Sequence, residues 1–228
     1  MLVCSRPALY QGYTWLRGGN KRRLALSGRT DIVIDGFPRS ANTFAVVSFE
    51  QAQNQAGATH IAHHTHVPAT IVEGCSRGLP VIVLIRDPVE ACASLAVYGD
   101  QRPELVLADW IWFYQTCWSV RHGFVTVPFE CAVSDFDAVI SAVNRRWSKS
   151  YQLFGATDEK LAKVQESIER IACEHGNGED QIARPSIARA DKKRVAREVI
   201  LADVGRLGVA MDIYESYIAV AREQGFKV

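Results

Sequence analysis

Several features are missing from this sequence, and each absence narrows what the protein can be. No stretch approaches the roughly 18 apolar residues of a membrane span, so we expect none. The amino-terminal segment has no continuous apolar core and no small-residue cleavage pattern, so we expect no secretory leader. The formal net charge is only +1, which argues against general binding to nucleic acid or to an anionic membrane. Any anion site must therefore be local.

The sequence also lacks paired cysteines. It has six cysteines without a Cys-x-x-Cys pair or a regular spacing, which favours reduced thiols in a cytoplasmic protein. Four of them lie in apolar stretches and are expected to be buried: Cys92, Cys117, Cys131 and Cys173.

The chain has 228 residues, of which 48% are hydrophobic and 22% are charged, as in an ordinary globular protein. Residues 32–34 and 81–85 are apolar runs typical of buried strands, and 59–62 and 124–127 are two further strand candidates. Helical patterns separate and follow them. The sequence therefore predicts one α/β domain, a three-layer, doubly wound parallel sheet of about four or five strands. Ligands bind at the carboxyl ends of the strands in such folds.

The loop after the first strand partly matches the nucleotide phosphate loop G-x-x-x-x-G-K-[ST]. Gly36 and Thr43 fall in register, while Ala41 replaces the second glycine and Asn42 replaces the lysine. The missing lysine argues against an ordinary ATPase or GTPase, because that lysine reaches the terminal phosphates. A positive charge stands three residues earlier, at Arg39. The context predicts an anion-binding loop of the P-loop NTPase-like type.

A second polar loop follows the strand at 81–85. Arg86 separates this strand from Asp87, which weakens any likeness to the magnesium-binding aspartate of ATPases. Ser94 stands eight residues after Arg86, within the helix that the sequence predicts from Pro88.

Four histidines lie between these two loops, at positions 60, 63, 64 and 66. Their spacing is not a familiar set of metal ligands, and no cysteine or carboxylate lies within the run. We therefore expect no metal site here.

Taken together, the three segments resemble the sulfotransferases that use 3′-phosphoadenosine-5′-phosphosulfate (PAPS). Residues 37–44 are similar to that family's Tyr-Pro-Lys-Ser-Gly-Thr-Thr-Trp loop, with Arg39 in place of lysine. Residues 64–68 are similar to its Lys-Thr-His-Leu-Pro segment. Arg86 and Ser94 have the separation of its 3′-phosphate ligands. Asp-Gly-Phe-Pro-Arg also occurs in adenylate kinases, but there it follows a lysine-bearing phosphate loop that this chain lacks.

The resemblance implies a role for each matched residue. His66 would be the general base and Arg39 would neutralise charge on the bridging oxygen of PAPS. Arg86 and Ser94 would bind the 3′-phosphate, and Phe44 would lie against the adenine. The remaining ligands of the phosphosulfate would be Pro38, Arg39, Ser40, Ala41, Asn42 and Thr43.

The resemblance weakens toward the carboxyl terminus. Arg184 or Arg189 would close over the 3′-phosphate, although a solvated basic helix face explains these residues equally well. Phe129 and Glu130 follow the fourth strand and are expected to be structural. The tryptophans of the helix expected at 103–121, at positions 110, 112 and 118, are expected to be core.

These inferences divide the domain into an extension over 1–30, a nucleotide-binding core over 31–135 and a helical part over 136–228. The expected reaction is sulfuryl transfer from PAPS to a hydroxyl or amine of a small-molecule or carbohydrate acceptor, without a metal. A P-loop kinase or ATPase and an inactive nucleotide-binding module are the alternatives. The sequence does not indicate which acceptor is used.

Overall fold

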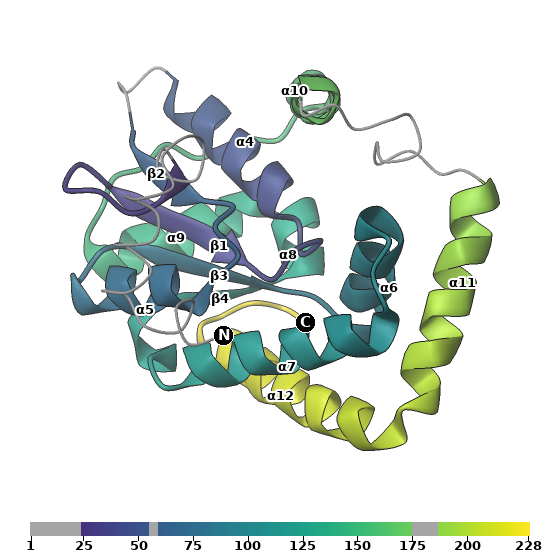
Figure 1. The fold of residues 1–228 in the computed structure, drawn as a ribbon. Helices are drawn as coiled ribbons and strands as arrows, with labels where there is room; N and C mark the ends of the chain where they lie inside the picture. Colours follow the sequence, from purple (N-terminus) through teal and green to yellow (C-terminus); the bar gives the residue numbers. More distant parts are fainter. Residues whose placement is uncertain (1–23, 55–58, 175–186) are drawn as a thin grey trace.

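The protein has a three-layer α/β architecture in which helices cover both faces of a central sheet, as the computed structural model shows (Figure 1). The structure describes residues 24–54, 59–174 and 187–228, with the backbone alone at 187–189. No helix in these ranges is long and apolar enough to cross a bilayer.

The described part of the sheet has four parallel strands in the order β2-β1-β3-β4. They are β1 (Ile32–Gly36), β2 (Ile61–His63), β3 (Val81–Ile85) and β4 (Val125–Pro128). Gly36 pairs with Leu84, so β1 and β3 end within one residue of each other, and β2 ends two residues earlier, where His63 pairs with Ile34. The predicted fold class and strand positions are confirmed, with ends shifted by one or two residues.

The layer of helices on one face of the sheet contains α5 (Pro68–Ser76), α6 (Pro88–Gly99), α7 (Pro103–Trp118), α11 (Ile187–Ala202) and α12 (Val204–Glu223). The opposite face is covered by α4 (Asn42–Gln53), α8 (Phe129–Ser134), α9 (Phe136–Trp147) and α10 (Asp158–Glu174). Val83 of β3 packs in the first layer's core and Leu84 in the second, which is why this strand is apolar throughout.

Two helical regions differ from the prediction. The helix expected at 103–121 ends at Trp118, and a short 3₁₀ turn, η1 (Arg121–Gly123), follows. Phe129 begins α8, a six-residue helix that the sequence did not predict because it is too short to show a periodic pattern. Trp110 is fully buried as expected, whereas Trp112 and Trp118 pack against the core from its margin.

The cysteines follow the prediction with one exception. Cys92, Cys117 and Cys131 are buried free thiols, but Cys173 is exposed. It lies two residues after Ile171, which packs against the core, and two residues correspond to about 200° around a helix. Cys173 therefore lies on the side of α10 opposite to Ile171 and is exposed.

A close approach of two strands requires the glycine at the end of β1. A Cβ atom at Gly36 would lie 2.4 Å from the carbonyl oxygen of Leu84 on β3. No side chain fits there, so the loop that carries the predicted anion site begins at a position where only glycine is tolerated.

Candidate functional site

The predicted site residues between Pro38 and Ser94 lie at or near the carboxyl edge of the sheet, where the loops after β1, β2 and β3 meet. The chain passes from β1 outward to β2 and then returns across β1 to β3, so the strand order reverses beside β1. Open parallel sheets bind ligands at such a reversal, because loops on either side diverge and leave room between them.

The backbone of the first two loops adopts an unusual conformation. Arg39 and Ala41 have φ values of 68° and 69°, and His64 and His66 have values of 51° and 52°. A left-handed conformation costs roughly 1–2 kcal/mol for a residue with a Cβ atom. Four such residues in two adjacent loops mark this edge as strained, which is common at functional sites.

Arg39 joins the first loop to the helix after β3. Its Nε donates a hydrogen bond of 3.0 Å to the hydroxyl of Ser94, which is 55 residues further along the chain. Its guanidinium also lies 5.0 Å from the ring centre of Tyr98, one turn later on α6. Arg39 and Ser94, which sequence analysis assigned to the same ligand, are therefore in direct contact.

Arg86 lies beside this pair at the end of β3. Its Nη1 donates to the carbonyl oxygen of Arg39 at 3.1 Å, and its guanidinium stacks 4.0 Å above the ring of Phe129. Burial lowers the pKa of Arg86, but an arginine remains charged at any physiological pH. Phe129 is thus the support of a half-buried cation, a contact that the sequence did not predict.

Glu90 connects this cluster to α11. Its carboxylate receives hydrogen bonds from Arg197 at 2.7 Å and from Lys193 at 2.8 Å, and it lies 3.9 Å from Arg86. The hydrogen bond from Arg197 lowers the pKa of Glu90 to about 2, so this group is ionised at neutral pH. Three cations, Arg86, Lys193 and Arg197, therefore gather around one carboxylate.

The structure does not test the two residues that sequence analysis named for closure over the 3′-phosphate. Arg184 lies outside the described residues, and Arg189 is on α11 in the stretch described by its backbone alone. Lys193 and Arg197, which sequence analysis did not assign to the site, lie further along α11 and bind Glu90 of α6. Their spacing of four residues, which places both on one helix face, was the signal that could have found them.

Within the first loop, two polar side chains point inward. The Ser40 side chain is fully buried, and its hydroxyl has no hydrogen-bond partner among the described residues. Asn42 donates from Nδ2 to the carbonyl oxygen of Phe37 at 2.9 Å, which braces the loop across its base. Pro38 is partly exposed, and Phe44 contacts Phe136 edge to face.

The loop after β2 carries the predicted base. His66 places Nδ1 2.8 Å from the carbonyl oxygen of Gly36 and 3.3 Å from Oδ1 of Asp35. Asp35 lies on β1 and is completely buried, although sequence analysis gave it no role. The signal was present, since a carboxylate at the end of an apolar strand needs a partner.

The neighbouring histidines form a second chain of contacts. Nε2 of His64 lies 3.0 Å from the hydroxyl of Thr43, and Nδ1 of His64 lies 2.6 Å from Nδ1 of His63. Burial lowers the pKa of His63, so this ring is neutral at pH 7. Across the described residues, no three histidine, cysteine or carboxylate side chains converge as metal ligands.

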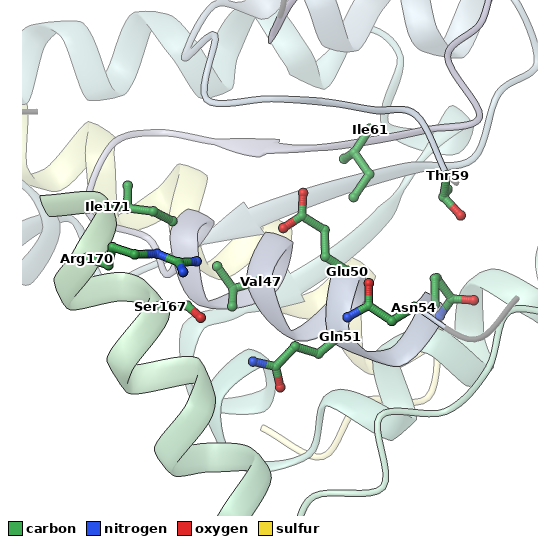
Figure 2. A pocket seen from close by; sticks show the side chains of 10 residues that line it. Val47, Glu50, Gln51, Asn54, Thr59, Ile61, Ser167, Arg170 and Ile171 are labelled. Atoms are coloured by element: carbon green, nitrogen blue, oxygen red, sulfur yellow. The ribbon is translucent and has the colours of Figure 1, made fainter. Parts of the chain in front are cut away.

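A separate hollow of about 370 Å³ lies between α4 and α10, beside the start of β2 (Figure 2). Amide, hydroxyl and charged side chains line it, including Glu50, Gln51, Ser167 and Arg170. None of the predicted site residues lines this hollow. The hollow follows the side of α4, whereas the clustered arginines and histidines lie at the carboxyl edge of the sheet.

No model of a protein family matches the chain, and no curated protein is significantly similar to it in sequence.

Proposed function

We propose that this protein is a sulfotransferase that takes its sulfuryl group from PAPS. The observation that carries the proposal is the contact between Arg39 and Ser94, with Arg86 bonded to the carbonyl oxygen of Arg39. Two motifs that resemble the donor site of that family, but lie far apart in the sequence, meet at the edge where parallel sheets bind ligands.

The charge of this edge suits the proposed donor. PAPS carries anionic groups at both its 5′ and 3′ positions, and Arg39 and Arg86 lie in the loops that would receive them. Lys193 and Arg197 add two further cations through Glu90. Charge-assisted hydrogen bonds from arginine to phosphate are among the strongest that proteins form.

The proposed reaction is an in-line transfer. The acceptor oxygen forms a bond to sulfur while the bond from sulfur to the bridging oxygen breaks, and 3′-phosphoadenosine-5′-phosphate (PAP) leaves. His66 takes the proton of the acceptor hydroxyl as general base. Arg39 stabilises the negative charge on the leaving phosphate but, as an arginine, does not transfer a proton.

A thermal shift assay tests the donor assignment without knowledge of the acceptor. We expect PAP to raise the melting temperature more than AMP does, because only PAP carries the 3′-phosphate. A ligand at 100 times its dissociation constant stabilises a protein by about 2.7 kcal/mol, which is readily measured. ATP with Mg²⁺ is the comparison for the kinase alternative.

The outcomes separate the alternatives. Stabilisation by ATP and Mg²⁺, with no preference for PAP over AMP, contradicts the proposal and favours a P-loop nucleotide kinase or ATPase. Stabilisation by PAP, without release of PAP from PAPS in the presence of any alcohol, phenol or amine, supports a nucleotide-binding module instead of an enzyme.

A further inference from the structure

We propose that Asp35 is a positioning residue, which holds His66 in the tautomer protonated on Nδ1 and leaves Nε2 as the basic atom. The catalytic consequence of this arrangement rests on the proposed function, whereas the arrangement itself does not. Asp35 belongs to none of the three segments on which the family resemblance was built.

The surroundings of Asp35 account for an ionised carboxylate inside the protein. It receives backbone hydrogen bonds from Gly36 and Thr65, both at 2.9 Å, and one from the hydroxyl of Thr65 at 2.6 Å. The backbone N–H of His66 is 3.2 Å from Oδ2. Burial disfavours the charged form of Asp35, but its hydrogen bonds and the nearby His66 outweigh burial and lower its pKa.

The tautomer of His66 follows from its acceptors. The carbonyl oxygen of Gly36 can only accept a hydrogen bond, so Nδ1, at 2.8 Å, must carry the proton. The nearby carboxylate of Asp35, at 3.3 Å, favours the same proton position. A neutral His66 therefore has its lone pair on Nε2, as a general base requires.

The titratable groups around His66 and Asp35 come from three elements. Asp35 lies on β1, His63 and His64 belong to the end of β2 and its loop, and the thiol of Cys117 on α7 is buried near Asp35. Burial works against a charged His66, yet the hydrogen bond to Asp35 and the charge of Asp35 outweigh it and raise the pKa of His66. The carboxylate thus makes His66 a stronger base.

Asp35 also holds the backbone that carries the base. His64 and His66 have left-handed conformations on either side of Thr65, whose N–H and hydroxyl both bind Asp35. Such a conformation persists only where surrounding contacts hold it. One carboxylate therefore orients both the ring and the loop.

Nitrogen-15 NMR of the histidine rings in the wild-type protein tests the tautomer directly. We expect neutral His66 to be protonated on Nδ1 and to titrate above the ordinary histidine value. A neutral ring protonated on Nε2, or a titration midpoint at or below that value, overturns the inference. This measurement needs no enzymatic activity and no variant, so it stands even where a substitution prevents folding.

The variant Asp35→Asn tests the cause. We expect the titration midpoint of His66 to move to lower pH than in the wild type. Asp31→Asn is the matched control, because Asp31 lies at the opposite end of the same sheet, beside His60 and half-exposed. An unchanged midpoint in folded Asp35→Asn, or an equal change in Asp31→Asn, contradicts the role of Asp35.

The raised pKa of His66 also predicts opposite effects of pH on activity and stability. The stabilisation that His66 gains from ionised Asp35 is complete below about pH 6.5 and is lost as pH rises through the raised pKa of His66. At acid pH it is also lost, as pH falls through the lowered pKa of Asp35. Turnover needs neutral His66 and increases over the same interval. Denaturant unfolding at several pH values, beside PAP release from PAPS, measures both. If His66 titrates as expected but the protein transfers no sulfuryl group, the result supports the role of Asp35 and contradicts the proposed function alone.

Discussion

The two sides of the carboxyl edge are built differently. On the arginine side, Arg39, Arg86 and Glu90 are partly exposed, and their contacts join α6, α11 and the first loop through long side chains. On the histidine side, a fully buried Asp35 accepts a hydrogen bond from the backbone of Thr65, and Nδ1 of His66 donates to the carbonyl oxygen of Gly36.

This difference teaches how binding and chemistry can be divided within one site. Long charged side chains can exchange one anionic partner for another, as an incoming phosphate requires. A base must instead keep one geometry and one tautomer, which a buried carboxylate with backbone donors provides. We therefore expect substitutions on the arginine side to change donor affinity and substitutions on the histidine side to change turnover.

Loss of the base should have the largest effect and should separate the two sides most clearly. We expect His66→Ala to lower turnover at least about 100-fold, the usual contribution of a general base, with nearly normal affinity for PAP. PAP release from PAPS with a panel of simple alcohols and phenols measures turnover, and calorimetry measures affinity.

Two further variants serve as a second test and a control. His66→Asn keeps a donor that can reach the carbonyl oxygen of Gly36 but has no basic Nε2, so it should lose turnover even if His66→Ala unfolds. His122→Ala removes an exposed histidine outside the site and should leave turnover unchanged. Normal turnover in folded His66→Asn contradicts the assignment of the base.

Arg86→Ala should show the reverse pattern. We expect the dissociation constant for PAP to rise about 10- to 100-fold, since a hydrogen bond to a charged group contributes about 1.5–3 kcal/mol. The dissociation constant for AMP, which lacks the 3′-phosphate, should change much less. Arg102→Ala is the control, because Arg102 is an exposed arginine that pairs with Glu104. Equal losses for PAP and AMP argue that Arg86 does not contact the 3′-phosphate.

The parts of the site that could be predicted from the sequence are those that strands position directly. Arg86 ends an apolar strand and Arg39 follows another, and the carboxyl ends of parallel strands lie at one edge. Local patterns therefore placed both arginines correctly at this edge. The same patterns predicted the four strands that the structure describes.

The rest depends on contacts between segments far apart in the chain. Lys193 and Arg197 reach Glu90 across 103 and 107 residues, and no local pattern specifies how α11 packs on α6. Asp35 was missed for another reason. The role of a carboxylate on a strand depends on which hydrogen-bond donors surround it after folding. The acceptor could not be predicted either, because no motif describes the surface that would receive it.

The smallest effect that we predict concerns the strained backbone that both sides share. Ala41 precedes α4 with a φ of 69°, a conformation that glycine adopts without a steric penalty. Ala41→Gly relieves that penalty but also increases the freedom of the unfolded chain. We expect a net gain of up to about 1 kcal/mol in the free energy of unfolding, measured by urea denaturation.

The matched control for this variant has the opposite sign. Ala219 is exposed within α12, where the backbone is helical, so Ala219→Gly should destabilise the protein by about 1 kcal/mol. A loss of stability in Ala41→Gly comparable to that of the control means that the loop does not hold a left-handed residue at position 41. Arg39 would then be the one strained residue of the first loop, against His64 and His66 in the loop after β2.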